Sequence, residues 1–325
     1  MMGIVCLAGD GIGPEVMASA VETIRALAPE LELQHELIGE AAIQAAGDPL
    51  PQQTLDACLR SDAVLFGAAG TSGSFGVLRA EEGLIRLRRE LDVYANLRPT
   101  RTSAMDLLIV RELVGGLYYG DKGRTTNDAF DTCVYSRHQI ERVARRGFDL
   151  ARDRGQRLTS VDKANVLETS RLWREVVTDI GASYPDVELD HVLVDAAGLF
   201  LVQDPGRFGV IVTENTFGDI LSDVAAGLGG GLGLAASASL SDGGPGVFEP
   251  VHGSAPDIAG LGIANPVAML RSVVLMFTYG LARPDLAEIL DSAIERAIEL
   301  APTPDLGGCA TTSDVTAAVL SAIAS

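Results

Sequence analysis

Short apolar runs alternate with longer amphipathic stretches along most of the chain. Five runs are largely hydrophobic over the length of a strand and are bounded by Gly or polar residues. They are residues 3–7, 62–67, 107–112, 191–196 and 209–214. Apolar strands separated by helices are typical of a largely parallel sheet with helices on both faces.

Between these runs, apolar residues recur every three or four positions, which predicts helices. The predicted helices cover residues 78–91, 137–154, 163–180, 265–282 and 284–300. A further helix starts at Pro14, because proline suits the first helical turn. The sequence therefore predicts an α/β protein.

The composition indicates a globular chain with an aliphatic core. The 325 residues are 47% hydrophobic but only 5% aromatic, and they suffice for one large domain or two ordinary ones. The net charge of −19 argues against nucleic acid as a partner, because phosphate binding needs a basic surface. An anionic substrate would therefore need a local cluster of positive charge.

Cysteine spacing and the first residues bear on the compartment. The four cysteines lie far apart with no C-x-x-C pair, so we expect reduced thiols and neither a disulfide framework nor a zinc site. Asp10 ends the first apolar run too early for a secretory signal. Residues 224–241 lack charge but are rich in Gly and Ser, so we expect a segment buried between packed elements, not a membrane span. These features predict a cytoplasmic protein.

Paired carboxylates occur in TENTFGDILSDVAAG (213–227), where Asp219 and Asp223 are four residues apart. On a helix both would project from one face and repel each other unless a cation lies nearby. Mg²⁺ or Mn²⁺ would supply that charge, since hard cations take carboxylate oxygens. Spacing alone more often means two exposed or helix-capping aspartates.

Several positively charged residues are also candidates for a site. Lys163 follows an apolar run directly before a predicted helix, where it is either an acid or base or a surface residue. Arg111 ends an apolar strand, where a charge needs an anionic partner. Together with Arg88 and Arg98, it would bind a dicarboxylate if the three converge, which the sequence does not show.

The segment GVFEPVHGSAPDIAGLGIANP (246–266) is too rich in Gly and Pro for regular structure. It carries His252, Asp257 and Asn265, so it either only turns the chain or forms a nucleotide-binding surface. The Gly-rich residues 9–15 lack the third glycine of a dinucleotide fingerprint, and residues 231–236 match it only by composition. Neither supports a Rossmann site.

Five motifs together resemble the isocitrate/isopropylmalate dehydrogenase family, and the isopropylmalate branch of it most closely. They are GDGIGPE, RELVGGLYYG, VDKANVLE, TENTFGDILSD and EPVHGSAPDIAG…ANP, in this order and almost from end to end of the chain. Their joint occurrence is specific, so it outweighs the simpler explanations of each motif. The resemblance implies an NAD-linked, metal-dependent, decarboxylating dehydrogenase of 2-hydroxy dicarboxylic acids.

The resemblance also implies roles for individual residues. Arg88, Arg98 and Arg111 would hold the substrate carboxylates, and Tyr118 and Lys163 would transfer protons. The divalent ion would be bound by Asp195, Asp219 and Asp223, with Lys163 and Asp195 reaching in from the partner subunit. The adenosine side of the cofactor would lie against Glu249, His252, Gly253, Ser254, Ala255, Asp257 and Asn265.

Two positions bear on specificity. By the resemblance, members of the family that use NADP have a Lys-Tyr pair at the positions where this chain has Asp257 and Ile258. Asp257 would repel a 2′-phosphate, so this position predicts NAD as the cofactor. The apolar side chains of Leu84 and Ile85, one turn before Arg88, match the isopropyl group of a substrate. An isocitrate enzyme would be expected to have Ser and Asn at these positions, and a homoisocitrate enzyme a basic residue. Another 3-substituted malate, such as tartrate, homoisocitrate or a specialised 3-alkylmalate, stays an alternative, because the segments 67–83 and 99–106 are short for the family.

The implied architecture is a continuous mixed sheet, not a Rossmann fold, in two interleaved domains. Residues 1–93 and 230–325 would form the cofactor-binding domain. Residues 94–229 would form the substrate, metal and dimerisation domain, with an arm near 121–136. We expect a homodimer with shared active sites and neither nucleic acid nor membrane as a partner. A non-catalytic regulatory subunit is less favoured, because Tyr118, Lys163 and the three aspartates are retained.

Overall fold

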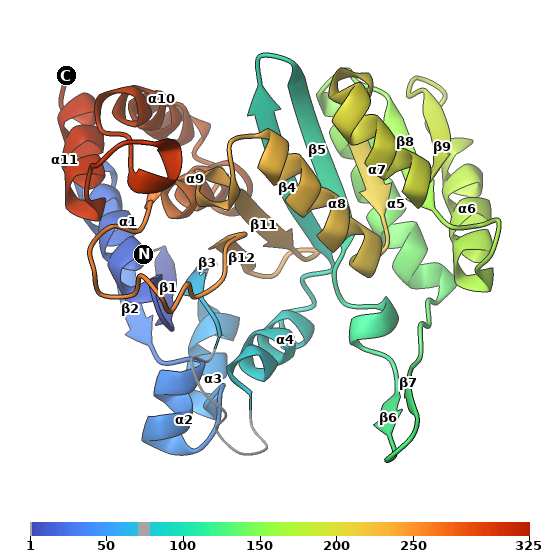
Figure 1. Ribbon diagram of the computed structural model, residues 1–325, viewed down its shortest axis with the longest axis horizontal. Helices are drawn as coiled ribbons and strands as arrows, with labels where there is room; N and C mark the ends of the chain where they lie inside the picture. The colour runs from blue at the N-terminus through green and yellow to red at the C-terminus, as the bar shows by residue number, and fades with distance from the viewer. Residues whose placement is uncertain (1, 71–78) are drawn as a thin grey trace. The chain divides into compact units, whose positions relative to one another are not determined.

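The computed structural model describes residues 2–70 and 79–325 (Figure 1). The chain forms two compact units, residues 1–93 with 230–325 and residues 94–229. We call them unit 1 and unit 2. Which function each unit serves stays a prediction. The start of the helix predicted at 78 and residues 71–78 of the shortened segment 67–83 lie outside the described residues.

Unit 1 combines a mixed sheet with helices on both sides. Its strands run in the order β2-β1-β3-β12-β11, all neighbours being parallel except β12 and β11. Figure 1 shows α1 and α9 to α11 on one side and α2 to α4 on the other. The strands are β1 (Gly3–Gly9), β2 (Glu32–Glu36), β3 (Ala63–Ala68), β11 (Ala236–Leu240) and β12 (Gly246–Pro250). The helices are α1 (Gly13–Leu27), α2 (Glu40–Ala46), α3 (Gln52–Arg60), α4 (Ala80–Glu90), α9 (Val267–Leu275), α10 (Pro284–Leu300) and α11 (Thr312–Ile323).

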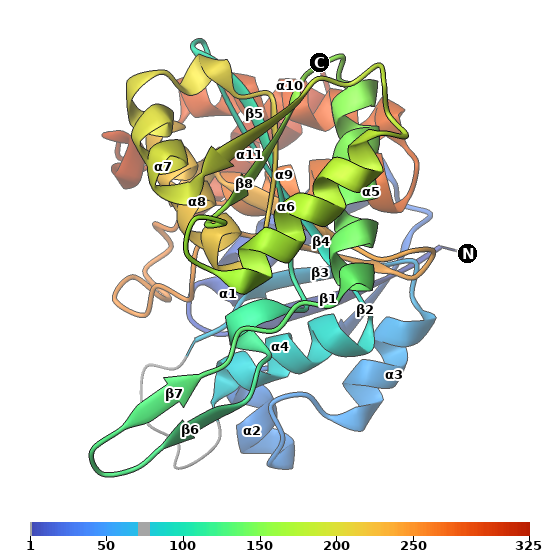
Figure 2. The same ribbon diagram turned by 90° about the vertical axis from the view of Figure 1, so that its right-hand side faces the viewer.

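Unit 2 repeats this layering. Its strands run in the order β4-β5-β10-β8-β9, with only β4 and β5 antiparallel. These strands are β4 (Ala95–Thr102), β5 (Met105–Glu112), β8 (Leu158–Asp162), β9 (Leu189–Leu193) and β10 (Val210–Thr213). The helices are α5 (Arg137–Asp153), α6 (Glu168–Gly181), α7 (Val194–Gln203) and α8 (Asn215–Leu228). A separate hairpin of β6 (Lys122–Arg124) and β7 (Ala129–Asp131) extends away from these layers (Figure 2).

The central strand β10 of unit 2 is buried along its whole length because both faces of the sheet are covered. Ile211 belongs to a core cluster with Ala197 of α7 and Leu221 of α8. The next residue, Val212, lies against Gly147 of α5 on the opposite face. Alternate side chains therefore pack into different helical layers, as the period of a strand requires.

Two predicted boundaries are wrong. The strand predicted at 191–196 ends at Leu193, and α7 begins at Val194, because Ala197 and Leu201 are buried with the period of a helix. The helix predicted at 163–180 begins only at Glu168. Residues 163–167 form a turn instead, in which the Asp162 carboxylate accepts a hydrogen bond from the backbone of Ala164 at 2.9 Å. Such local side-chain bonds compete with helix formation.

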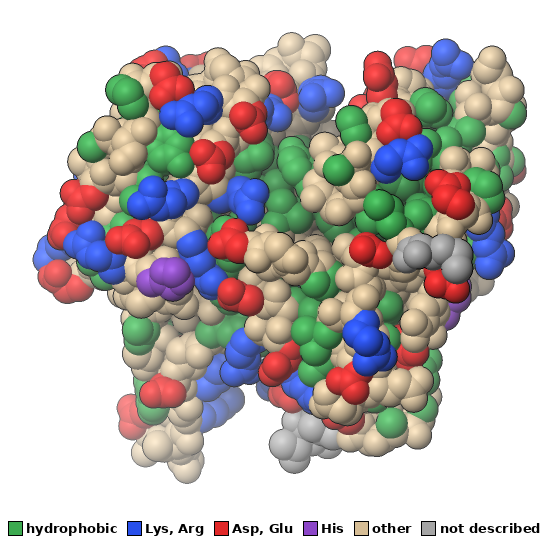
Figure 3. Space-filling view, turned by 180° about the vertical axis from the view of Figure 1, so that it is seen from behind, with side chains coloured by type: hydrophobic (Ala, Val, Ile, Leu, Met, Phe, Trp, Pro, Cys, Tyr) green, Lys and Arg blue, Asp and Glu red, His purple; other side chains and the backbone are tan. Residues whose placement is uncertain are grey.

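Two further segments differ from expectation in part. The helix predicted at 265–282 is α9, followed by a π-helical turn at Met276–Gly280. In the uncharged segment 224–241, the residues of β11 are buried, but Leu228 and Leu232 are exposed, so it is not buried throughout. Among the described residues, no helix is both long and apolar enough to cross a membrane. On the face drawn in Figure 3, acidic and basic side chains are interspersed.

Candidate active site

The register of β4 and β5 places polar residues on the face of the sheet that α8 covers. Asn96 of β4 lies opposite Arg111 of β5, and Arg98 follows two residues later on the same face. Because β10 runs parallel beside β5, with Thr213 next to Arg111, α8 begins directly above this row. The strand pairing alone therefore brings two arginines under one helix.

The arginines are buried and meet the acidic face of α8. Arg98 donates through Nη2 to Asp219 and through Nη1 to Asp223, each at 3.3 Å. Arg111 forms a short ion pair with Asp219 through Nη1. Its side chain is only 3% exposed, so its charge requires this partner. Arg98, Arg111 and the two aspartates thus form one cluster, in which two guanidinium groups are available to bind an anionic substrate.

Tyr118 joins the same cluster from a short 3₁₀ helix at Gly116–Tyr118. Its hydroxyl donates to Asp219 Oδ2 at 3.0 Å, and the Arg111 guanidinium lies 5.7 Å from its ring centre. Burial raises the pKa of Tyr118, and the neighbouring Asp219 raises it further. The phenol is therefore held protonated, with its hydrogen bond directed at Asp219.

Asp219 and Asp223 offer carboxylate oxygens on adjacent turns of one helix face, which fits a hard divalent cation. Burial raises the pKa of Asp223 first of all, and the Asp219 charge adds to this, while Arg98 acts in the opposite direction. Within the described part of this chain, no group of three His, Cys, Asp or Glu side chains is placed to hold a metal. A complete site would therefore need ligands from outside this cluster.

Lys163 and Asp195 pair with each other elsewhere in unit 2. Lys163 lies in the turn after β8, and Asp195 lies in the first turn of α7. The Lys163 ammonium lowers the pKa of Asp195, mainly through their hydrogen bond. Behind them, Asp162 is 1% exposed and accepts two hydrogen bonds from Arg174, at 2.8 and 2.9 Å, which fixes the end of β8.

In unit 1, Arg88 of α4 donates to Glu249 of β12 at 2.7 Å, and both side chains are largely buried. Leu84 and Ile85 lie on the preceding turn and are partly buried. Glu249 therefore acts here as a partner of a predicted substrate arginine, beyond the cofactor role expected from the motif. Whether Arg88 meets the same substrate as Arg98 and Arg111 stays a prediction.

The predicted cofactor loop follows β12 in unit 1. The Ser254 carbonyl accepts a hydrogen bond from the backbone of Ile12 at 2.9 Å, so the loop is tied to the first Gly-rich turn. His252 Nδ1 lies 3.0 Å from the Gly253 carbonyl, while its buried Nε2 has no hydrogen-bond partner. Burial lowers the pKa of His252. A neutral imidazole with a buried, unpaired nitrogen fits a ligand that supplies a polar atom, such as a nucleotide base.

Other loop residues differ in exposure. Gly253 and Asp257 are exposed, Ala255 is partly buried with a φ of 39°, and Asn265 is buried. The Asn265 amide donates to Asp305 at 3.0 Å and accepts from the backbone of Val267 at 3.0 Å. Asp305 is a residue that the sequence reasoning missed, because it lies 40 positions away in the chain.

Comparison with known proteins decides which family has this site. The sequence matches the isocitrate/isopropylmalate dehydrogenase family over residues 3–319. The chain belongs to the isocitrate/isopropylmalate dehydrogenase family. This confirms the family, the fold class and the decarboxylating-dehydrogenase class that the motifs indicated.

Similar members of the family cover almost the whole chain. A 3-isopropylmalate dehydrogenase of Bacillus cereus (strain ATCC 10987 / NRS 248) is 49% identical over an alignment 339 positions long with gaps, which covers 98% of this chain and 95% of that protein. One of Zymomonas mobilis is 47% identical over an alignment 348 positions long with gaps, which covers 99% of this chain and 100% of that protein. The crystal structure of isocitrate dehydrogenase from Methylococcus capsulatus is similar with a TM-score of 0.93 at 38% identity, covering 100% of both chains.

Three residues of this dehydrogenase site were missed in the sequence. Arg98 Nε donates to Asn96 Oδ1 at 2.8 Å, and Arg98 Nη1 donates to Ser222 Oγ at 2.7 Å. Asn215 accepts two hydrogen bonds from Arg111. The signals were present, since Asn96 is two positions before Arg98 on a strand and Asn215 is four before Asp219 on a helix. The sequence alone did not show that these residues bind the arginines, because that depends on how the strands pair.

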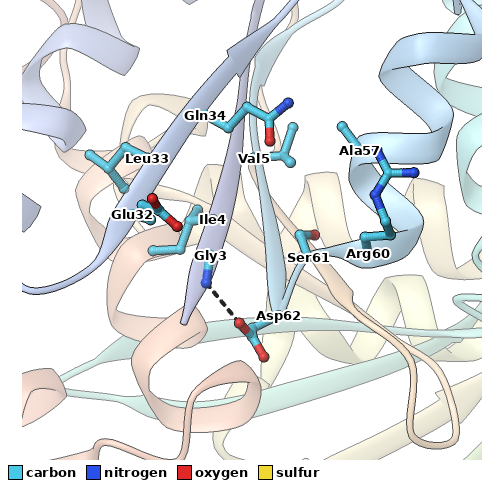
Figure 4. Close-up of a pocket in the computed structure, with 10 residues that line it drawn as sticks. All are labelled: Gly3, Ile4, Val5, Glu32, Leu33, Gln34, Ala57, Arg60, Ser61 and Asp62. Atoms are coloured by element: carbon cyan, nitrogen blue, oxygen red, sulfur yellow. Dashed lines mark hydrogen bonds between the residues drawn. The ribbon is translucent and has the colours of Figure 1, made fainter. Parts of the chain in front are cut away.

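A hollow of about 470 Å³ in unit 1 is separate from these residues of the dehydrogenase. Figure 4 shows it between the starts of β1 and β2 and the end of α3, with the Gly3 N–H donating to Asp62 at 2.7 Å. It lies at the amino ends of parallel strands. Ligand sites of α/β sheets lie at the carboxyl ends, where the cofactor loop is found.

Proposed function

We propose that this protein is an NAD-dependent 3-isopropylmalate dehydrogenase of the leucine-biosynthesis type. It would oxidise (2R,3S)-3-isopropylmalate and release CO₂ to give 4-methyl-2-oxopentanoate. The observation that carries the proposal is the cluster around Asp219, where Arg98, Arg111 and Tyr118 meet a single carboxylate. It combines carboxylate-binding cations, a protonated phenol and acidic metal ligands in one place, in a chain of this family.

The residues divide the chemistry between them. Arg98 and Arg111 bind and orient the substrate carboxylates through charged hydrogen bonds. Lys163, in its neutral amine form, would take the proton of the hydroxyl group as the C2 hydrogen leaves as hydride. Tyr118 then delivers a proton to the carbon from which CO₂ has departed. A bound Mg²⁺ or Mn²⁺ would supply Lewis-acid polarisation of the C2 oxygen, and NAD would supply the hydride acceptor.

The carboxylates of Asp219 and Asp223 would hold the divalent ion together with Asp195 of a second subunit. The same dimer would bring Lys163 to the partner's cluster. Support comes from exposed apolar side chains on α7 and α8, with Leu199, Val202 and Ile220 more than half exposed. Phe130 of the hairpin is 60% exposed as well. Apolar surface of this kind marks protein interfaces, so we propose a homodimer with shared active sites.

Cofactor binding is proposed for the loop that begins at Glu249. The unpaired Nε2 of His252 would meet the adenine, and exposed Asp257 would bind ribose hydroxyls and repel a 2′-phosphate. The enzyme should therefore prefer NAD. A higher kcat/KM with NADP than with NAD would contradict this choice. The four cysteines are free thiols, which supports a location in the cytoplasm.

Leu84 and Ile85 support isopropylmalate as the substrate, since partly buried apolar side chains beside Arg88 suit a branched alkyl group. The test is a substrate panel with NAD and Mn²⁺, containing 3-isopropylmalate, other 3-alkylmalates, isocitrate, homoisocitrate and tartrate. Isopropylmalate should give the highest kcat/KM. Better turnover of another malate would replace the substrate but keep the enzyme class, whereas no turnover at all would favour a regulatory subunit.

A further inference from the structure

Asn215, the first residue of α8, is completely buried and uses its polar groups in a single network. Its side-chain oxygen accepts hydrogen bonds from Arg111 Nε at 2.9 Å and Nη2 at 2.7 Å. Its side-chain nitrogen donates to the carbonyls of Leu113 at 3.1 Å and Gly115 at 3.0 Å. The backbone N–H donates to the Tyr135 hydroxyl at 3.0 Å.

The chemistry of these partners dictates an asparagine. A guanidinium only donates hydrogen bonds and a backbone carbonyl only accepts them, so the amide has a single satisfied orientation. An aspartate would pair with Arg111 but would face two carbonyls without a proton to donate. An apolar residue would remove the hydrogen bonds that Asn215 makes to Arg111 and to both carbonyls, and the loss of buried hydrogen bonds is costly.

The carbonyls that Asn215 holds belong to the turn that leads to Tyr118. On the other side of this turn, the Glu112 carboxylate accepts from the backbone N–H groups of Val114 at 3.1 Å and Gly115 at 2.8 Å. Gly116 follows with a φ of 73°, and an added Cβ there would lie 2.5 Å from the Tyr135 hydroxyl. The turn is thus fixed from both sides just before the tyrosine.

We infer that Asn215 is a positioning residue that holds Arg111 and the Tyr118 turn in one fixed geometry. The two residues whose positions depend on Asn215 both contact Asp219. Arg111 does so through its ion pair, and Tyr118 through its hydroxyl at 3.0 Å. One amide therefore sets substrate binding through Arg111 and proton delivery through Tyr118. This inference deepens the proposed function and rests on it for its kinetic part.

The test compares Asn215→Ala and Asn215→Asp with the matched control Thr216→Ala. Thr216 is the next residue of α8, and its buried hydroxyl has no hydrogen-bond partner. For folded Asn215→Ala, kcat/KM for isopropylmalate should fall about tenfold to a hundredfold, the effect of losing a hydrogen bond to a charged group. The loss should appear in both KM and kcat, while the control keeps wild-type values.

Asn215→Asp separates the binding of Arg111 from the binding of the turn before Tyr118. It also provides a test if the alanine variant does not fold. Aspartate still accepts from Arg111, so the KM for substrate should stay closer to wild type than in Asn215→Ala. Aspartate cannot donate to the carbonyls of the turn before Tyr118, so kcat should fall in Asn215→Asp as well as in Asn215→Ala. Equal KM values in the two variants, or wild-type kcat in folded Asn215→Asp, would overturn the inference.

A measurement without substrate keeps this test apart from the proposed function. In protein labelled with ¹⁵N-arginine, the buried Nε–H of Arg111 should exchange slowly with solvent, and Arg111→Lys identifies its signal. Exchange should be at least about tenfold faster in Asn215→Ala and unchanged in Thr216→Ala. Unchanged exchange in Asn215→Ala would overturn the inference, whereas a wild-type protein inactive on isopropylmalate would overturn only the proposed function.

Discussion

Arg98 contacts both carboxylates of the acidic pair on α8, with Nη2 3.3 Å from Asp219 and Nη1 3.3 Å from Asp223. A single guanidinium thus bridges two aspartates one helical turn apart and reduces their mutual repulsion. The same carboxylates are the proposed metal ligands, so substrate binding and metal binding meet at this arginine.

Replacing Arg98 by lysine should weaken substrate binding. Lysine keeps the charge but cannot donate to Asn96, Ser222 and the two aspartates at once, because its ammonium is a compact point charge. The KM for isopropylmalate should rise about tenfold or more, corresponding to the loss of charged hydrogen bonds. Steady-state kinetics at saturating NAD and Mn²⁺ measure this. Arg101→Lys on the same strand, where the side chain is 73% exposed, is the control and should change nothing.

Removing one acidic ligand should raise the metal requirement. Asp223→Asn leaves the helix geometry intact but reduces the negative charge offered to the cation, and carboxylate count sets the affinity of such sites. The Mn²⁺ concentration for half-maximal activity should rise at least about tenfold. Titration of the chelated enzyme with Mn²⁺ measures it, and exposed Asp153→Asn is the control. If Asp223→Asn had the metal dependence of wild type, Asp223 would not be a ligand.

The buried carboxyl of Glu112 should make stability depend on pH. Burial raises its pKa from 4.5 to about 7, although the N–H groups of Val114 and Gly115 act in the opposite direction. The folded state therefore holds this proton at pH values where the unfolded chain has lost it. Its contribution to the free energy of unfolding is fully present below about pH 4.5 and is lost as the pH rises towards about 7, at about 1.4 kcal/mol per pKa unit.

Glu112→Gln removes this titration. The free energy of unfolding by urea, measured from pH 4.5 to 8, should decline less in the variant than in wild type. Glutamine also retains an acceptor for one of the two backbone N–H groups. Glu288 is exposed, so Glu288→Gln is the control, and its free energy of unfolding should decline with pH as that of the wild type does. Parallel curves for wild type and Glu112→Gln would show that Glu112 titrates normally in the folded protein.

Shared active sites predict complementation between two inactive variants. Lys163→Met and Asp219→Asn should each abolish turnover as homodimers. A mixed dimer contains one site with an intact Asp219 from one chain and an intact Lys163 from the other. After subunit exchange, an equal mixture should regain about a quarter of wild-type activity by random pairing of two chains. No recovery in a mixture shown to contain heterodimers would place Lys163 and Asp219 in the same subunit's site.

The dimer surface can be tested separately. Leu199→Glu places a charge on an apolar side chain of α7 that is 52% exposed, so it should dissociate the dimer, because an unpaired charge at an interface core is costly. Light scattering should show that the variant is a monomer, and an activity assay should show no turnover. Ile289→Glu, on α10 of unit 1 and 46% exposed, is the matched control and should stay dimeric. A Leu199→Glu variant that remained dimeric would exclude this face of α7.

Part of the fold could be predicted from the chain, because a buried parallel strand and an amphipathic helix each leave a local pattern, but the strands β2, β4, β8, β11 and β12 were not predicted. Four of the five predicted strands agree with β1, β3, β5 and β10 within two residues. The two failures near Lys163 and Asp195 have different causes. The predicted helix begins only at Glu168, because the Asp162 carboxylate forms a turn with Ala164. The predicted strand ends at Leu193, because α7 takes up the rest of the apolar run.

The sequence by itself determined the family, the candidate residues and the chemistry they can perform, because these depend on residue types at fixed local spacing. Only the tertiary structure decided how those residues are held. Asn215 reaches Arg111 across 104 positions of sequence, and Ser222 reaches Arg98 across 124. Such partners follow from strand register and helix placement, which long-range packing sets. The acidic pair and Arg98 were each visible in the sequence, whereas the ion pairs that join Arg98 to Asp219 and Asp223 were not.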